Sequence, residues 1–277
     1  MVDESFGIFS PKNFIEYIGQ NRAKKVATVI VNASRIEQRP LPNILIDGSH
    51  GLGKTSLARV IYNELNIEPK VVDASTFNKE DYSLPDKVII DEIHNLDPQV
   101  ADSLNILIDK GRTSFIGCTT NPGSLSPAFR SRFRAIHLER YTFNEIKQII
   151  SMVLLRKGVN TNGTAINDIA KRSRLNPRVA LNNLAFIFDY MTVQVSGLTP
   201  KIVKEAFMAL GIDKDGLTER DYSYIRALPD DRPVGIQYIS AALGIDAKTI
   251  EAEIEPFLLQ SKYIDRMPRG RIKLREI

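Results

Sequence analysis

The feature that most constrains the fold is a glycine-rich loop, GSHGLGKTS, at residues 48–56. It follows a short apolar run, NILID, and leads into KTSLARVIYNEL, whose apolar residues recur at helical spacing. A G-x-x-x-x-G-K-[ST] loop between a strand and a helix points its backbone N–H groups at phosphate oxygens. Lys54 would neutralise the β- and γ-phosphates, and the Thr55 hydroxyl would bind Mg²⁺. We therefore predict that this loop binds nucleotide phosphates.

Further short apolar runs follow in the first half of the chain. KVVDA, KVIID and TSFIGCTT are each long enough for a buried strand and too short for a helix, and helix-like stretches such as NFIEYIGQNRAKKVATVIVNASRI alternate with the strands. This alternation predicts an α/β domain in which crossover helices cover a parallel sheet.

Two adjacent carboxylates end one of these runs, in KVIIDEIHNL. Asp91 at the strand tip is expected to hold Mg²⁺, directly or through water, and Glu92 to activate the attacking water. The alternative is an acidic helix start, since Asp and Glu are favoured in a first turn. The phosphate loop and the intervening strand weaken that alternative.

The run FIGCTTNP ends in polar residues at the same predicted edge of the sheet. Ligands of open parallel sheets bind outside the carboxyl ends of the strands, so Thr119, Thr120 or Asn121 could sense the γ-phosphate or orient the water. Thr-Asn-Pro-Gly is also a good turn sequence, and both interpretations can hold together.

Three arginines are candidates for contact with phosphate. Arg130 and Arg132 follow that strand in LSPAFRSRF, where an arginine that reached a neighbouring γ-phosphate would stabilise the transition state. An ordinary surface arginine is the alternative. Arg178 stands at the start of a helix in NPRVALNN, where a cation is unfavourable for the helix dipole and so suggests another role.

Strand signals fade after about residue 140, and four helical segments punctuated by Gly, Asn and Pro follow. The polar stretch GIDKDG then reads as a linker. Three more helices and two strand-like runs around a Pro-Arg-Gly turn outline a winged helix. We predict a nucleotide-binding domain over 1–139, a helical domain over 140–212 and a winged-helix domain over 213–277.

Composition excludes several classes of protein. Of 277 residues, 43% are hydrophobic and 25% are charged, so wholesale disorder is not expected. No run suits a membrane span or a secretory signal, and we expect a cytoplasmic protein with no membrane partner. Cys118 cannot form an internal disulfide and reads as a small buried hydrophobe. The histidines at positions 50, 94 and 137 have no ligand-like partner and read as structural.

Positive charge is concentrated at the C-terminus. The last sixteen residues, KYIDRMPRGRIKLREI, hold six basic and two acidic side chains, and the whole chain has a net charge of only +4. Such a surplus points to a polyanion partner, with a solvated tail as the alternative.

In their order along the chain, these motifs resemble the RuvB family, the AAA+ motors of Holliday-junction branch migration. The similarity runs through EYIGQ, GxxGLGKT, IDEIH, IGCTTNPGSLSPAFRSRF, LERYTFNEI and RSRLNPRVALN to a C-terminal PVG…EPFLLQ…R-x-PRGR pattern that generic AAA+ proteins lack. The resemblance implies an AAA+ P-loop NTPase with a parallel sheet, an all-helical lid and a winged helix. It also implies ATP and Mg²⁺ as cofactors, DNA as a partner and a homo-oligomeric, hexameric ring.

The resemblance also implies individual roles. Tyr17 and Ile18 look like adenine-pocket residues, and the lid contacts would be Tyr141 and the sensor-2 arginine Arg178. The phosphate loop is matched by Gly51, Leu52, Gly53, Lys54, Thr55 and Ser56. The remaining matches are Asp91 and Glu92 for Walker B, Thr119 and Thr120 for sensor 1, Arg132 for the arginine finger, and Arg266, Arg269 and Arg271 for the DNA-contacting wing.

Three departures limit this transfer of roles. Ser49 and His50 replace two prolines of the family's phosphate loop, and Ser10 replaces an arginine of its N-terminal nucleotide segment. Between IDEIH and GCTT the chain is much shorter than in the family, which inserts there the β-hairpin that docks its partner RuvA. We therefore expect a motor protein that lacks this hairpin, which leaves a RuvA-like partner in doubt.

A second class shares the same ATP-site motifs, namely loaders that place a clamp or a replicative helicase on DNA. The winged helix favours the motor, whereas the missing hairpin and the short chain leave room for a loader or a specialised DNA-binding AAA+ protein. An inactive binding protein is a third possibility. It is disfavoured because Lys54, Glu92, Arg132 and Arg178 are present together.

Overall fold

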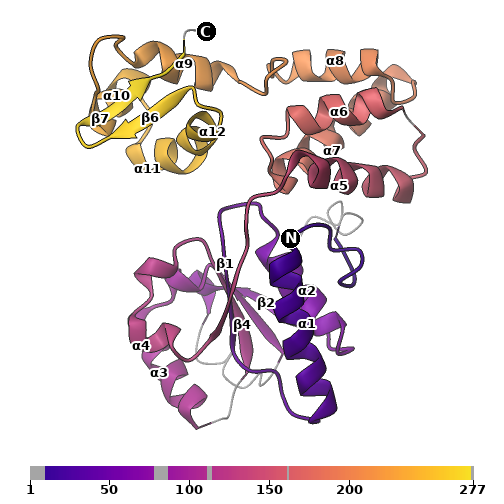
Figure 1. Cartoon of the computed structure of the whole chain (residues 1–277), viewed down its shortest axis with the longest axis vertical. Helices are drawn as coiled ribbons and strands as arrows, with labels where there is room; N and C mark the ends of the chain where they lie inside the picture. The colour runs from indigo at the N-terminus through magenta and orange to yellow at the C-terminus, as the bar shows by residue number, and fades with distance from the viewer. Residues whose placement is uncertain (1–9, 78–86, 111–113, 161, 276–277) are drawn as a thin grey trace. The chain divides into compact units, whose positions relative to one another are not determined.

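The computed structural model describes residues 10–77, 87–110, 114–160 and 162–275. Contacts within the chain divide it into two compact units, each described by itself below (Figure 1). The first is Met1–Gly158 with Leu175–Asn182, and the second is Val159–Arg174 with Asn183–Ile277.

A five-stranded parallel sheet forms the centre of the first unit. Its strands lie in the order β2-β3-β4-β1-β5, which confirms the predicted parallel sheet. Asp47 pairs in register with Thr119, and Asp73 pairs with Asp91, so the carboxyl ends of four strands meet at one edge. The strands are β1 (Ile44–Asp47), β2 (Lys70–Asp73), β3 (Val88–Asp91), β4 (Phe115–Thr119) and β5 (Arg134–His137).

The fifth strand, β5, is absent from the sequence prediction for a physical reason. It lies at the edge of the sheet, and of its four residues only Ile136 is buried. A half-exposed edge strand has no continuous apolar run to signal it.

Helices flank this sheet in the first unit (Figure 1). Side-chain caps fix several of their starts: Asp97 accepts from Gln99 N at 2.9 Å, and Thr142 and Glu145 form a capping box. The helices beside the sheet are α1 (Asn21–Ile36), α2 (Lys54–Asn63), α3 (Pro98–Asp109) and α4 (Pro127–Arg130). The first unit also includes α5 (Phe143–Arg156) and the short 3₁₀ turns η2 (Ala74–Thr76), η4 (Ile93–Asn95) and η5 (Pro122–Ser124).

Helix α1 begins later than its apolar spacing predicts, at Asn21 rather than near Asn13. Gln20 has a left-handed backbone (φ 51°), and a right-handed helix cannot continue through such a residue. Its side-chain amide bonds both backbone groups of Glu139, at 2.6 and 2.9 Å. This anchoring keeps residues 13–18 outside the helix.

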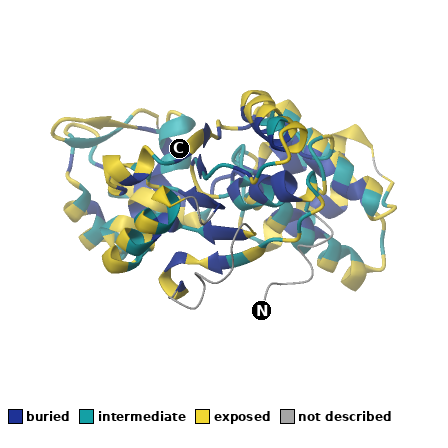
Figure 2. Cartoon of the chain, turned by 90° about the horizontal axis from the view of Figure 1, so that it is seen from below, coloured by how far each residue is buried: buried dark blue, intermediate teal, exposed yellow. Residues whose placement is uncertain are grey.

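The core of the first unit lies along the strands, where buried residues concentrate in Figure 2. One cluster centres on Phe115, Phe129 and Phe133, whose rings meet edge to face at centroid distances of 5.5 and 5.0 Å. Cys118 in β4 is fully buried, as predicted, and burial raises the pKa of its thiol.

The helical segments predicted for the middle of the chain all form. After α5 come α6 (Gly163–Lys171), α7 (Pro177–Gln194) and α8 (Pro200–Ala209). The two contact units divide this region differently from the predicted domain boundary at residue 140, because α5 and the start of α7 belong to the first unit. Helix α7 continues from the first unit into the second.

The predicted linker GIDKDG is a tightly bonded turn rather than a free connection. The Asp213 carboxylate accepts hydrogen bonds from Asp215 N and Leu217 N at 2.8 Å and from the Tyr222 hydroxyl at 2.6 Å. Polar composition alone does not separate such a turn from a linker, since Asp and Gly favour both.

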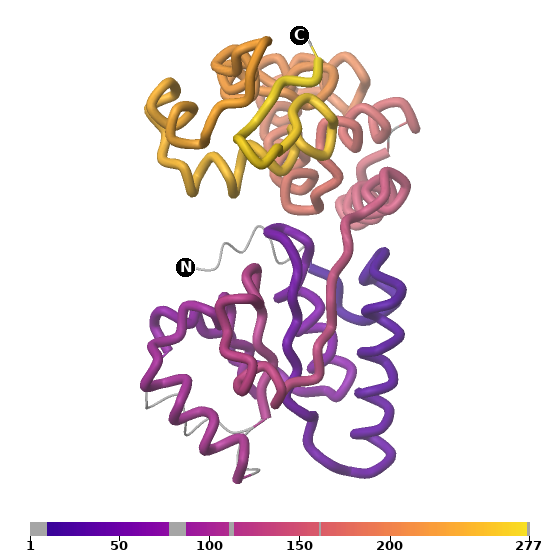
Figure 3. Tube along the Cα trace, turned by 60° about the vertical axis from the view of Figure 1, so that its left-hand side comes forward, coloured from indigo at the N-terminus to yellow at the C-terminus, as the bar shows by residue number. Residues whose placement is uncertain are grey.

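The C-terminal part of the second unit has the predicted winged-helix outline, seen at the orange and yellow end of the trace in Figure 3. Its hairpin is antiparallel, and a bridge between Val234 and Arg271 adds a third chain segment. Gly270 (φ 137°) lies against Val234, whose carbonyl oxygen would be 2.2 Å from an added Cβ. The elements are α9 (Glu219–Ala227), α10 (Ile236–Leu243), α11 (Ala247–Thr249), the π turn η6 (Ile250–Ile254), α12 (Glu255–Gln260), β6 (Ile264–Met267) and β7 (Gly270–Lys273).

The segment between β3 and β4 contains η4 and α3, and its described residues, 92–110 and 114, hold no strand. Residues 111–113, where part of a shortened insertion would fall, lie outside the described residues. Among the described residues, no helix has the length and apolar character that crossing a membrane demands.

Candidate nucleotide site and winged-helix surface

A cavity of about 390 Å³ opens at the carboxyl edge of the sheet, and every residue that lines it belongs to the first unit. It brings together the phosphate loop, the end of β3 and the start of α7. The lining residues are Ser10, His50, Gly51, Gly53, Lys54, Thr55, Ser56, Asp91, Glu92, Pro177, Arg178 and Leu181.

Lys54 opens helix α2 beneath the phosphate loop, and its side chain is only 6% exposed. Its ammonium group donates to the loop carbonyls of Gly48 at 3.0 Å and Ser49 at 3.3 Å. Burial lowers the pKa of Lys54, and the nearby Glu92 carboxylate partly opposes this effect. A phosphate entering the cavity would stabilise the charged form in the same way, so the site is prepared for an anion.

The Thr55 hydroxyl and the Asp91 carboxylate meet at the carboxyl end of β3. The Thr55 hydroxyl donates to Asp91 Oδ2 at 3.0 Å, and both residues line the cavity. Magnesium prefers hard oxygen donors of these two kinds, supplemented by water and substrate phosphates. The residues present therefore fit a magnesium ion bound together with a nucleotide.

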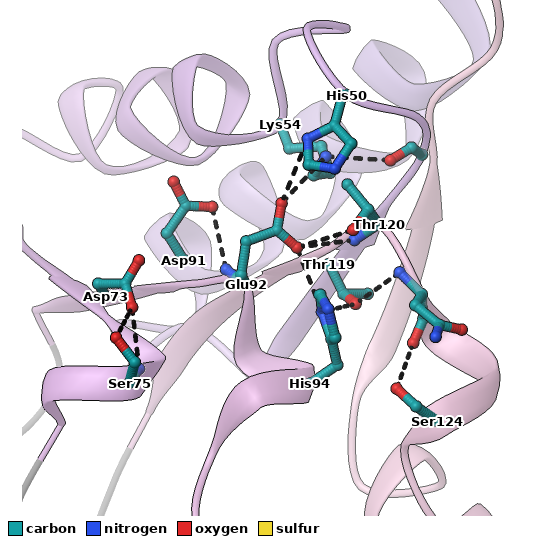
Figure 4. Close-up of polar contacts among 12 residues, drawn as sticks. His50, Lys54, Asp73, Ser75, Asp91, Glu92, His94, Thr119, Thr120 and Ser124 are labelled. Carbon is teal, nitrogen blue, oxygen red and sulfur yellow. Dashed lines mark hydrogen bonds and ion pairs between the residues drawn. The ribbon is translucent and has the colours of Figure 1, made fainter. Parts of the chain in front are cut away.

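Glu92 is held in a strained backbone conformation, with φ 47°. Its Oε2 accepts from the Thr120 backbone N–H at 3.1 Å and from the Thr120 hydroxyl at 2.9 Å, and lies 3.2 Å from His94 Nδ1 (Figure 4). Its Oε1 lies 4.0 Å from Lys54 Nζ. The carboxylate is thus fixed by the end of β4 while it borders the cavity.

The two threonines at the end of β4 have different surroundings. Thr119 is fully buried, with its hydroxyl 3.0 Å from His94 Nδ1. Thr120 contacts Glu92 directly. The sequence could not separate the two threonines, whereas in the structure Thr120 hydrogen-bonds Glu92, which lines the cavity.

The start of α7 is tied to the phosphate loop by Asn176. Its side-chain amide donates to the His50 carbonyl at 2.9 Å, and its Oδ1 accepts from Arg178 N at 2.9 Å. Arg178 is exposed and lines the cavity. A cation at this helix start, unfavourable on its own, becomes reasonable beside an anion site.

Four residues assigned to nucleotide contact are outside the cavity lining: Tyr17, Ile18, Tyr141 and, within the phosphate loop itself, Leu52. The Tyr17 hydroxyl donates to the Gly53 carbonyl at 3.1 Å, and the Tyr141 hydroxyl lies 3.4 Å from the Leu52 carbonyl. Tyr17, Leu52 and Tyr141 are buried, and Ile18 is half-buried. In the described geometry the two tyrosines brace the loop.

Arg132 is likewise outside the cavity lining, two residues after the end of α4. Its guanidinium makes two hydrogen bonds to the Asp109 carboxylate, both at 2.8 Å. In this pair Arg132 is half-buried and Asp109 is exposed, with side-chain exposures of 27% and 56%. A ligand that offered more negative charge could compete with such a partly exposed pair.

The three wing arginines differ sharply in their surroundings. Arg269, at the hairpin tip, is exposed and has no ion-pair or hydrogen-bond partner among residues 10–77, 87–110, 114–160 and 162–275. The Arg271 side chain is only 13% exposed, and its Nε donates to Glu255 at 2.8 Å. Arg266 is half exposed and donates to the same carboxylate at 2.9 Å.

Comparison with known proteins places this geometry in a family. The model described as the Holliday junction DNA helicase RuvB P-loop domain matches residues 9–138, the RuvB AAA lid domain matches 141–213, and the RuvB C-terminal winged helix domain matches 214–274. The chain belongs to the RuvB family. The AAA+ fold with a helical lid and a C-terminal winged helix is thereby confirmed.

Individual RuvB proteins are similar over most of their length. The Holliday junction branch migration complex subunit RuvB of Aliarcobacter butzleri is 35% identical over 294 residues, covering 95% of this chain and 85% of that protein. That of Acholeplasma laidlawii is 32% identical over 295 residues, covering 95% and 88%. The structure of the Thermotoga maritima RuvB Holliday junction branch migration motor superposes with a TM-score of 0.86 at 33% identity, covering 96% of this chain and 95% of the other.

Within this RuvB-family chain, some residues near the site carry no sequence signal of their own. Leu181 reaches the cavity from α7. His50, treated as a variation of the loop, lines the cavity 3.9 Å from Glu92. His94, interpreted as structural, bridges Thr119 and Glu92. Only the spacing of His94 after Asp91 and Glu92 could have suggested its position.

Proposed function

We propose that this chain is an ATP-driven motor that moves or remodels Holliday-junction DNA; its RuvB relatives are named for Holliday junction branch migration. One observation carries the proposal: Lys54, Thr55, Asp91, Glu92 and Arg178 converge on one cavity in a chain that matches RuvB models from its P-loop domain to its winged helix. Every family model and relative described above is a RuvB, which leaves the loader alternative without support of its own.

In this proposal the phosphate loop binds the ATP phosphates. Backbone N–H groups of Gly51, Gly53 and the start of α2 face the phosphate oxygens. Lys54 exchanges its loop carbonyls for the β- and γ-phosphates, and Arg178 contacts the γ-phosphate from α7. When bound, Mg²⁺ neutralises charge that builds up on the phosphates, and Thr55 and Asp91 would hold it.

Glu92 is the proposed general base. It accepts a proton from the water that attacks the γ-phosphate, while Thr120 holds the carboxylate in place. The left-handed backbone at Glu92 and its two hydrogen bonds from Thr120 support this assignment. Such restraint limits the positions that the carboxylate can sample before the reaction.

Arg132 is proposed to act on the nucleotide of a neighbouring subunit in a hexameric ring. Its partial exposure and its place outside the lining of the chain's own cavity agree with that role. To stabilise the transition-state charge it would have to leave Asp109 or rotate about it. Adenine contacts from Tyr17 and Ile18, and a lid contact from Tyr141, remain part of the proposal.

DNA is proposed to contact the wing through Arg269 and the exposed side of Arg266, with Arg271 shaping the hairpin beneath them. The exposed cations would bind phosphates, which supply affinity with little dependence on sequence. The strand-free described part of the β3–β4 segment supports action without a RuvA-like docking hairpin. The site of action would be the cytoplasm, with the DNA.

ATP hydrolysis measured with and without a synthetic four-way junction tests the catalytic assignment. We expect Glu92→Gln to lose turnover by about 100-fold or more while it still binds nucleotide. Glu139→Gln makes the same chemical change at an exposed carboxylate outside the cavity and should leave turnover unchanged. Wild-type turnover in Glu92→Gln would refute the assignment.

Branch migration assayed without RuvA, alongside a loading assay with candidate clamps and helicases, tests the biological activity. Migration of the four-way junction supports the motor. Activity in the loading assay alone would overturn it in favour of a loader.

A further inference from the structure

The short loop between α6 and α7 combines an unusual backbone with contacts at both of its ends. Arg174 and Leu175 are consecutive non-glycine residues in the left-handed region, with φ of 54° and 52°. Such residues are uncommon singly, and they persist only where the surroundings over-determine them. The division between the two compact units falls between these two residues.

The C-terminal end of this loop, at Asn176, contacts the phosphate loop of the nucleotide cavity. Asn176 donates to the His50 carbonyl and caps the helix that presents Arg178, with both hydrogen bonds at 2.9 Å. An added Cβ on Gly51 would lie 2.3 Å from Asn176 Oδ1, so the phosphate loop and this residue are in close contact. Any shift of the phosphate loop on binding phosphate must therefore be felt at Asn176.

The N-terminal end of the loop, at Arg174, contacts the winged helix. The Arg174 guanidinium forms an ion pair with Asp221, which is 1% exposed, and its Nε donates to the Gly216 carbonyl at 3.1 Å. The same guanidinium lies over the Phe257 ring, 4.4 Å from the ring centroid. Arg174 thus holds the start of α9 and the side of α12 at once.

Asp221 makes this attachment part of the winged-helix scaffold. Its Oδ2 also accepts from Thr218 N at 2.7 Å and from the Thr218 hydroxyl at 2.6 Å, which caps α9. A neighbouring attachment runs through Arg172, whose Nε donates to Asp213 O at 2.8 Å and whose carbonyl accepts from Asn183 in α7 at 3.4 Å. The loop is therefore fastened to the winged helix by charged, largely buried groups.

We infer that Arg174 couples the two ends: it is the positioning residue through which the nucleotide bound at the cavity alters the affinity of the winged helix for DNA. The inference rests on the proposed function, because it assumes that the cavity binds ATP and the wing binds DNA. A change at Asn176 and Arg178 reaches Arg174 over two peptide units whose torsions leave little freedom. Arg174 then passes it to α9 and α12 through Asp221 and Phe257.

Coupling of this kind is a ratio of affinities and can be measured without turnover. The DNA affinity is determined by fluorescence anisotropy of a labelled four-way junction, once with ADP and once with a non-hydrolysable ATP analogue. For the wild type we expect the two affinities to differ by about fivefold or more. Linkage requires the junction to change the analogue-to-ADP affinity ratio by the same factor, which gives a second, independent reading.

Arg174→Met is expected to bring this ratio to within about twofold of unity while the junction affinity with ADP changes by less than about threefold. Lys171→Met is the matched control. It removes the same charge three residues earlier, from an exposed pair with Asp215 whose side chains are 54% and 37% exposed, and should leave the ratio unchanged. Arg174→Lys keeps the charge but loses the fork geometry, and should recover part of the ratio.

A second variant guards against loss of the fold. Leu175→Gly leaves every Arg174 contact in place and suits a positive φ, so it relaxes the connection without weakening either end. It too should lower the ratio. If Arg174→Met folds and keeps the wild-type ratio of junction affinities, the inference is overturned. If Arg174→Met does not fold, a wild-type ratio in Leu175→Gly overturns it. Failure of the wild type to bind the junction or the nucleotide at all would instead overturn the proposed function.

Discussion

Arg269 at the tip of the wing and Arg271 in strand β7 should respond differently to the same substitution. Arg269→Gln and Arg271→Gln each remove one positive charge two residues apart in the hairpin. Arg269 is exposed and its charge faces solvent. Arg271 is 13% exposed and is bound by Glu255, which is fully buried.

The expected sizes follow from these surroundings. Loss of one phosphate contact makes the slope of log affinity against log salt less steep by about 0.9. When salt rises from roughly 50 to 200 mM, the fold-decrease in the DNA affinity of Arg269→Gln should therefore be about 3.5 times smaller than that of the wild type. Arg271→Gln should leave that slope unchanged. It should instead cost about 3 kcal/mol of unfolding free energy, because it removes one partner of a buried pair while Arg266 still offsets part of the charge on Glu255.

Fluorescence anisotropy of a labelled duplex over a salt series gives the slopes, and urea unfolding of the full chain followed by circular dichroism gives the stabilities. Glu255 is the residue on which the reasoning turns, since its buried carboxylate neutralises Arg271. A slope for Arg271→Gln that falls as far as that of Arg269→Gln, with unchanged stability, would refute this division of roles. An unchanged slope for Arg269→Gln would remove the wing tip from the DNA interface.

Three further predictions concern single contacts. Gly270→Ala should destabilise the winged helix by about 2–4 kcal/mol in urea unfolding, since the new Cβ would meet Val234 O and φ is positive; a smaller loss than about 1 kcal/mol would contradict the tight contact. Burial alone would raise the pKa of Glu255, but hydrogen bonds from two arginines and a tyrosine hold it below its ordinary 4.5. The stability gained from this carboxylate is then present above pH 4.5 and lost as pH falls through the lowered folded pKa. The difference in unfolding free energy between wild type and Glu255→Gln should therefore narrow on acidification below pH 4.5, and a difference that stays constant would count against this reasoning. Thr120→Val should reduce kcat for ATP about 10- to 100-fold with little change in KM, because Glu92 loses its hydroxyl donor; an unchanged kcat in steady-state assays would show that the backbone donor suffices.

The phosphate loop and the ends of the central strands could be predicted because their signals are local. Strand, loop and helix around Lys54 are contiguous, and the parallel register then brings Asp91 and Thr120 to the same edge. Helical spacing and the strand-like runs around a Pro-Arg-Gly turn predicted the helical domain and the winged helix, and the family resemblance assigned roles to residues within them. The edge strand β5 escaped prediction because one buried residue in four leaves no apolar run.

The remaining features depend on contacts between distant residues. Nothing near Arg271 in the sequence says that its charge is bound by Glu255, sixteen positions earlier. Leu175 carries no sign of its left-handed backbone, which glycine would have signalled. Asp213 reads as part of a polar linker until its three hydrogen bonds are seen.

The burial of Cys118 makes this chain unusually convenient for optical work. A thiol must ionise to react with a maleimide, and full burial with a raised pKa prevents this in the folded protein. We therefore expect the folded chain not to react with such dyes, although its sequence holds one cysteine. Glu68→Cys in the first unit and Arg220→Cys in the second would place a donor and an acceptor at exposed positions. Energy transfer between them could follow the two units through single cycles of ATP turnover, with the native cysteine left in place.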